Sequence, residues 1–90
     1  KFGMTSDIRR AANSIAHNIA EGFGRYEPRD KTRFYKISRG SSYELISQLL
    51  ALNALDYLTE KIMEELTFLC KNVINELDAI IKTQESRKNP

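Results

Sequence analysis

The side chains that could do chemistry in this chain are arginines interleaved with aromatic residues in its first half. Guanidinium groups contact phosphates, and exposed aromatic rings stack on nucleobases. Glu27 and Asp30 interrupt the run, so an ordinary solvated helix face is the competing interpretation. The candidate nucleic-acid-binding residues are Arg25, Tyr26, Arg29, Arg33, Tyr35 and Lys36.

No comparable pattern of residues suggests an enzyme active site. His17 and Glu21 are four residues apart and share a helix face, but zinc needs three or four ligands, so a solvated histidine is favoured. The serines of "RGSSYE" lack a nucleophile-elbow motif, and "GFGR" is too short for a phosphate loop. Cys70 falls on an apolar helix stripe and is expected in the core. We therefore expect no catalytic residue, no metal and no cofactor.

Length and composition point to one small domain covering residues 1–90. A chain this short buries only about 60% of its unfolded surface, so its core is marginal. One cysteine excludes an internal disulfide, which leaves self-association as the remaining source of stability. No signal peptide and no apolar run near 18 residues is apparent, so we expect a cytoplasmic protein without a membrane partner.

The charge is asymmetric. Residues 1–45 hold nine Lys or Arg against five Asp or Glu, whereas residues 46–90 hold five against seven. The first half is therefore the half that suits a polyanion such as RNA.

Periodicity predicts three helices over about residues 6–22, 28–55 and 59–83, in an all-α, up-down antiparallel bundle. Ser6 with Asp7, Pro28, and Thr59 with Glu60 provide start signals, and Gly22 is expected to end the first helix in a left-handed conformation. The third helix has ten apolar positions between Ile62 and Ile81, a stripe wide enough for more than one neighbour.

Gly40 lies in the middle of the second predicted helix, where a glycine costs about 1 kcal/mol relative to alanine. Close packing of Gly40 and Ser41 against alanines of the first helix would explain this, and a kink is the alternative. Glu44 follows the same patch. Arg9, Arg10 or Asn18 could pair with it, or it could be an ordinary surface glutamate.

Two stretches carry a family resemblance. "DIRRAANSIAHNIAEGFGR", residues 7–25, is similar to the signature of the four helix bundle proteins, also called 23S rRNA intervening-sequence proteins. "RFYKISRGSSYEL", residues 33–45, resembles their second motif. The residues carried over as packing and assembly positions are Arg9, Arg10, Ser14, Asn18, Glu21, Gly22, Arg39, Gly40, Ser41, Glu44 and Leu45.

The resemblance implies a four-helix bundle whose first family helix precedes the "GMTSDIRRA" position, so three helices are expected here. Members are encoded in insertions within some bacterial 23S rRNA genes. A related accessory protein of diversity-generating retroelements forms a pentameric barrel that binds nucleic acid and a reverse transcriptase. The resemblance therefore implies a homo-oligomer, plausibly a pentamer, with RNA and a protein such as a reverse transcriptase as possible partners.

Two hypotheses follow. The first is a non-enzymatic, homo-oligomeric helical protein that binds structured RNA or an RNA–protein complex through its arginines. The second is a structural or protein-interaction module with no nucleic-acid role. A helix-turn-helix DNA reader is disfavoured, because a second helix of roughly 28 residues is too long for that motif.

Overall fold

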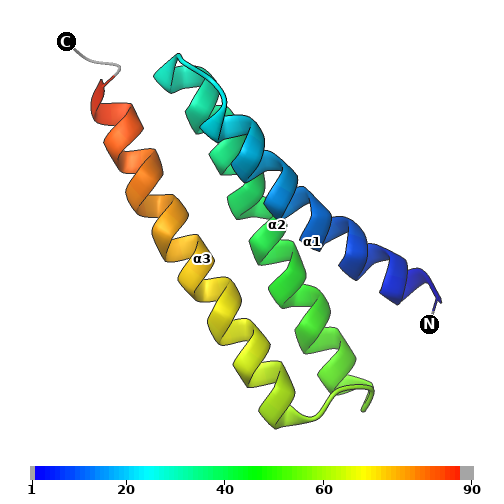
Figure 1. Ribbon diagram of the computed structural model, residues 1–90. Helices are drawn as coiled ribbons and strands as arrows, with labels where there is room; N and C mark the ends of the chain where they lie inside the picture. The colour runs from blue at the N-terminus through cyan, green and yellow to red at the C-terminus, as the bar shows by residue number, and fades with distance from the viewer. Residues whose placement is uncertain (1, 88–90) are drawn as a thin grey trace.

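The computed structural model describes residues 2–87, which form three antiparallel α-helices (Figure 1). Helix α1 spans Phe2–Phe23, α2 spans Pro28–Ala54 and α3 spans Glu60–Arg87. The all-α, up-down class is therefore confirmed. The Cα atoms extend over 51 × 22 × 13 Å, so the molecule is long and thin.

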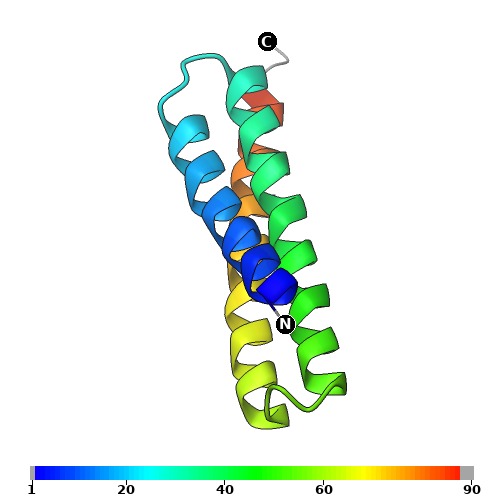
Figure 2. The same ribbon diagram turned by 90° about the vertical axis from the view of Figure 1, so that its right-hand side faces the viewer.

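Helix α2 packs against both α1 and α3, whereas α1 and α3 do not pack against each other among the described residues (Figures 1 and 2). The chain is thus two helix pairs that share α2, without a core common to all three helices. The second neighbour expected for the wide apolar stripe of α3 is not supplied by α1.

The two helix pairs have different chemistry. The pair formed by α2 and α3 is apolar, with a core of Tyr35, Leu77 and Ile81 against which Val73 packs. The pair formed by α1 and α2 is built from small and polar residues. Those that are buried are Ala11, Asn18, Ser38, Ser41 and Ser42.

Helix α1 begins at Phe2, so the expected start at Ser6 and Asp7 is wrong. The helix runs through Gly3, and the apolar face continues back through Met4, which lines a small cavity together with Ile8 and Leu52. Ser6 and Asp7 therefore lie on the exposed side of a continuing helix, where Asp7 pairs with Arg10 at 3.5 Å.

Gly22 does not end α1 in a left-handed conformation, because no described glycine has a positive φ and the helix continues to Phe23. The side chain of Lys31 instead completes the helix end, since its Nζ donates to the carbonyl oxygens of Gly22 and Phe23 at 3.2 and 3.0 Å. A cation near the last carbonyls also complements the helix dipole.

The start signals of the other two helices are confirmed. Pro28 is at the first turn of α2, followed by Asp30. Thr59 accepts a hydrogen bond on Oγ1 from the backbone N–H of Ile62 at 3.2 Å and so caps α3. Helix α3 runs four residues beyond its expected end at residue 83, and the last turn includes Glu85, which pairs with Lys36 of α2. Residues 88–90 of the expected polar tail lie outside the described residues.

Candidate nucleic-acid interface

The basic residues lie at the end of the molecule where α1 turns into α2, next to the C-terminal end of α3 (Figure 1). Residues 24–39 hold six Lys or Arg against Glu27 and Asp30. Arg29 and Arg87 also line one recess with Glu27, Pro28 and Asp30, so α3 adds a cation to a recess that also holds two carboxylates. Helix α2 thus positions Arg29, in its first turn, beside the link and the last turn of α3.

Two arginines share one aromatic ring. The guanidinium carbon of Arg25 lies 4.7 Å from the centroid of Phe34, and that of Arg33 lies 4.3 Å from it. These are cation–π distances. Phe34 is half-buried, so the ring holds both planar groups at the surface, where their remaining N–H donors can reach a phosphate.

Ion pairs reduce the free charge of the cluster. Arg25 pairs with Glu21 at 3.1 Å, and Lys36 pairs with Glu85 at 3.0 Å. Both pairs are substantially exposed, so each contributes little to stability and can exchange partners. Arg29 and Arg33 have no acidic partner within salt-bridge distance among residues 2–87, so their charge is not offset by an ion pair in the described chain.

Tyr35 is a correction to the sequence-based site. Its side chain is 5% exposed and packs in the α2–α3 core, so it is not available for stacking on a base. Burial raises the pKa of its hydroxyl group. Tyr26, by contrast, is 96% exposed in the link. The position of Tyr35 among the arginines in the sequence does not reveal which side of α2 faces α3.

The structure adds three residues that the sequence pattern did not single out. Phe23 is 80% exposed at the end of α1. The Nζ atom of Lys31 lies 5.9 Å from the centroid of Phe23. Phe34 joins Arg25 and Arg33. Their proximity to the arginines in the sequence was the available signal, but a periodic apolar reading assigns such aromatic residues to the core.

The packing motif lies mainly between α1 and α2. Ser14 Oγ and Ser41 Oγ are 2.7 Å apart, and Ser38 Oγ donates to the carbonyl oxygen of Ile15 at 2.9 Å. Asn18 is buried, and its side-chain nitrogen donates to the carbonyl oxygen and Oγ of Ser14 at 2.8 and 3.1 Å. These bonds let the two helices approach closely while satisfying their polar groups.

Arg10 is the residue that pairs with Glu44, at 3.1 Å between Nη2 and Oε2. This contact and the nearby Asp7 raise the pKa of Arg10. Arg39 pairs with Asp78 of α3 at 2.7 Å, so it joins α2 to α3 rather than to α1. Leu45 is half-buried.

Gly40 is a second correction. A Cβ atom added to Gly40 would meet no heavy atom within 4 Å outside its own stretch of helix, so within one chain Gly40 makes no close packing contact. The small residue that does so is Gly22, where an added Cβ would lie 2.6 Å from Cε1 of Tyr35. The helix α2 is also uninterrupted through Gly40.

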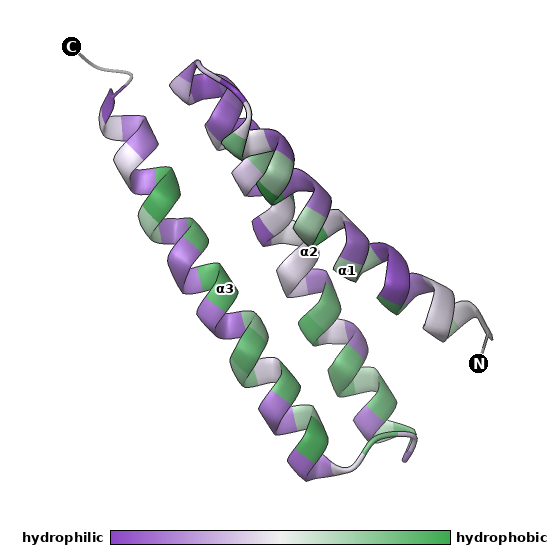
Figure 3. Ribbon diagram, in the orientation of Figure 1, coloured by the Kyte–Doolittle hydropathy of each residue, from purple (hydrophilic) through white to green (hydrophobic). Residues whose placement is uncertain are grey.

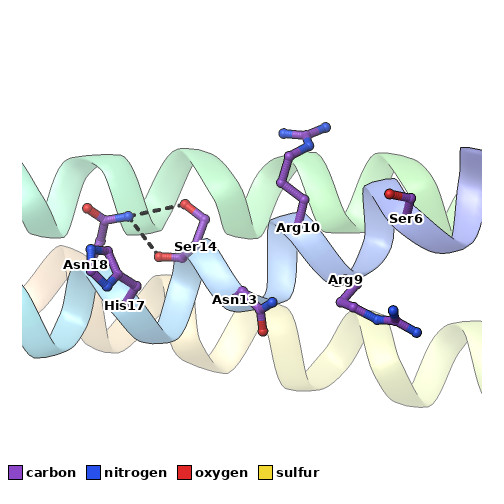
Figure 4. Close-up of a pocket in the computed structure, with 7 residues that line it drawn as sticks. All are labelled: Ser6, Arg9, Arg10, Asn13, Ser14, His17 and Asn18. Atoms are coloured by element: carbon purple, nitrogen blue, oxygen red, sulfur yellow. Dashed lines mark hydrogen bonds between the residues drawn. The ribbon is translucent and has the colours of Figure 1, made fainter.

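The outer face of α1 is polar. Figure 4 shows Arg9 and Asn13 projecting from the side of α1 opposite Arg10. They border a shallow recess with hydrogen-bonding side chains but no second helix as a wall. The residues that line it are Ser6, Arg9, Arg10, Asn13, Ser14, His17 and Asn18.

Two further features of the described residues concern metal binding and membrane spanning. No group of three or more His, Cys, Asp or Glu side chains that could hold a metal occurs between residues 2 and 87. None of the three described helices is long and apolar enough to cross a membrane. Cys70 is buried on α3, and burial raises the pKa of its thiol.

Comparison with curated proteins and with solved structures gives no significant match. The family model for the 23S rRNA-intervening sequence protein matches residues 1–79. This match covers all of α1 and α2 and most of α3, including both motifs that form the α1–α2 seam. The chain belongs to the 23S rRNA-intervening sequence protein family.

Proposed function

We propose that this protein is a non-enzymatic, homo-oligomeric helical protein that binds RNA through the arginine-rich end formed by the α1–α2 link and the first turns of α2. The observation that carries the proposal is the pairing of Arg25 and Arg33 on the ring of Phe34, next to Arg29. Three guanidinium groups gathered at one end provide a phosphate-binding surface. The family description, which concerns an rRNA insertion, is consistent with an RNA partner.

Self-association is part of the proposal because α3 leaves apolar side chains exposed. Figure 3 shows hydrophobic residues recurring along α3, yet only α2 packs against it within the described chain. The exposed fractions of Leu66 and Leu69 are 38% and 57%. With Ile62 and Ile80 they continue one side of the helix. Burial of this stripe against other copies would remove it from water and bring several arginine-rich ends together.

The second candidate function is a structural or protein-interaction module without a nucleic-acid role. The exposed apolar stripe on α3 is consistent with this second function as well as with self-association, since an apolar face suits a protein partner better than RNA. The ion pairs of Arg25 and Lys36 also favour it, because they offset part of the charge that RNA would need. RNA binding and its salt dependence separate the two candidates.

The test replaces Arg25, Arg29 and Arg33 by glutamine and measures RNA affinity over a series of salt concentrations. The variant should fold and associate like the wild type, because exposed charges add little to stability. Its affinity for RNA should fall, and the slope of log K against log salt should decrease by up to about 2–3 per protomer.

The matched control replaces Lys71 and Lys82, which are exposed on α3, by glutamine. This control should change RNA affinity much less. Equal losses from both sets would mean that binding is diffuse. A salt-independent interaction, or no loss from the arginine set, would favour the protein-interaction module.

A further inference from the structure

Two aromatic side chains at the end of α1 and in the α1–α2 link are largely exposed to solvent. Phe23 is 80% exposed and Tyr26 is 96% exposed. A single exposed apolar residue needs no explanation, because much of any protein surface is apolar. Two such rings within four residues, each with only a small part of its surface buried, contribute little hydrophobic stabilisation to the chain. Their placement is better explained by a ligand.

Basic residues lie near both aromatic residues, in space for Phe23 and in the sequence for Tyr26. Lys31 lies over Phe23, with 5.9 Å between its Nζ atom and the ring centroid. Arg25 lies between the two aromatic residues in the chain, and its guanidinium group is held on Phe34. Residues 23–33 hold four Lys or Arg against Glu27 and Asp30, so this segment keeps a net positive charge. An apolar protein partner would not require this charge, whereas a ligand with flat rings and a negative backbone would.

We infer that this end of the molecule binds unpaired RNA bases, with Tyr26 and Phe23 as stacking platforms and Arg29 and Arg33 as phosphate contacts. The inference depends on the proposed RNA-binding function and specifies its substrate class, which is a single-stranded loop, bulge or end. Base stacking on an aromatic ring requires a base that has left its own stack. The bases of a continuous A-form duplex remain stacked on one another, so a duplex could use only the arginines.

Phe34 has a different role from the two link residues. It is half-buried, and Arg25 and Arg33 already lie over it. Its ring positions two guanidinium groups. Replacing Phe34 would therefore disturb the phosphate contacts and the stacking platforms together, and so it is a poor test of base recognition.

The experiment compares two RNAs with the same number of nucleotides, a hairpin with an unpaired loop and a blunt duplex. The wild type should bind the hairpin more tightly. Tyr26→Ala should weaken hairpin binding by about fivefold or more, the lower end of the loss expected for one stacked base. Tyr26→Phe keeps the ring and should bind like the wild type. Neither change should alter the salt slope, since no charge is removed.

Tyr43→Ala is the matched control, because Tyr43 is 56% exposed but lies about 22 Å along α2 from Pro28. It should leave hairpin binding unchanged. Circular dichroism melts of the two Tyr26 variants should match that of the wild type, since Tyr26 is almost wholly exposed. Phe23→Ala provides an independent second variant with the same expected loss.

The outcomes separate the inference from the function on which it depends. Wild-type protein that binds hairpin and duplex equally, or a Tyr26→Ala variant that keeps full hairpin affinity, would overturn base stacking and leave the RNA proposal standing. Wild-type protein that binds neither RNA would overturn both. A hairpin preference lost in Tyr26→Ala and retained in Tyr26→Phe would support the inference.

Discussion

Gly22 of α1 lies directly against the ring of Tyr35 of α2, so closely that a Cβ atom at Gly22 would be 2.6 Å from Cε1, 2.9 Å from Cδ1 and 3.0 Å from Cζ. Tyr35 also belongs to the α2–α3 core with Leu77 and Ile81. Tyr35 thus connects the two helix pairs of the chain, and Gly22 is the position that admits its ring.

Gly22→Ala should destabilise the protein. The added methyl group must displace the ring of Tyr35, which is held by the core, and such overpacking typically costs about 1–3 kcal/mol. The gain in helix propensity, about 1 kcal/mol, offsets part of this cost. The free energy of unfolding from a urea titration should therefore fall.

Gly40→Ala is the control on the neighbouring helix. With no heavy atom within 4 Å of its added Cβ outside the helix, it should keep the propensity gain and raise the free energy of unfolding by up to about 1 kcal/mol. A Gly22→Ala protein more stable than the wild type would show that the ring can move aside. A destabilised Gly40→Ala protein would show that another chain covers Gly40.

The contrast between the two glycines shows what the sequence could predict. Helix number, order and the starts at Pro28 and Thr59 follow from local signals, namely periodicity and capping residues. Which glycine is in a close contact depends on the rotation of α1 and α2 about their axes. A pattern of small residues does not specify that rotation. The sequence therefore predicts the close helix contact at Gly40, whereas the structure has it at Gly22.

The candidate site was predicted to a similar degree. The arginines lie together because they are close in the sequence and spaced along one helix. Tyr35 was assigned to the wrong face because α2 is covered on two sides, by α1 and by α3. The exposure of Phe23 could not be predicted, because it depends on which side of α1 is covered by α2, and the local sequence does not specify this.

Ser38→Ala should cost about 0.5–1.5 kcal/mol of unfolding free energy. Ser38 is fully buried, and its hydroxyl group donates across the α1–α2 seam to the carbonyl oxygen of Ile15 at 2.9 Å. Ser42 is equally buried, but its hydroxyl group donates within α2 to the carbonyl oxygen of Ser38. Ser42→Ala should therefore cost less, since it removes no contact between helices. Equal losses of unfolding free energy in the two variants, measured by chemical denaturation, would show that the hydrogen bond between the helices contributes no more than the one within α2.

Raising the pH should weaken the fold through Cys70. Burial raises the pKa of its thiol, so the folded chain retains this proton at a pH where the unfolded chain, with a pKa of about 8.5, has lost it. The unfolded state then binds fewer protons, and the free energy of unfolding falls as pH rises above about 8.5, towards the folded pKa. At pH 7 the Cys70 thiol should not affect the free energy of unfolding.

Urea titrations at several pH values measure this effect, and Cys70→Val should lose the part of the slope that begins near pH 8.5. Alkylation with iodoacetamide is an independent measurement. The native thiol should react more slowly than the same thiol in urea, since the thiolate is the reactive form. Equal rates at pH 8 would contradict a buried, proton-retaining Cys70.

Replacing Leu66 and Leu69 by glutamine should abolish self-association and leave the helices intact. Leu69 is 57% and Leu66 38% exposed on α3 in the single chain, and neither belongs to the buried core, so the helices should persist with a modest loss of intrachain packing at Leu66. If copies bury this stripe, the wild-type melting temperature should rise with protein concentration, because association stabilises the folded state by mass action. The double variant should melt at a concentration-independent temperature and have monomer mass by light scattering.

Leu55→Gln, at a 58% exposed position in the α2–α3 turn, serves as the control and should associate like the wild type. Wild-type protein with monomer mass at every concentration would contradict the prediction, and the exposed stripe would then be a surface for a different protein.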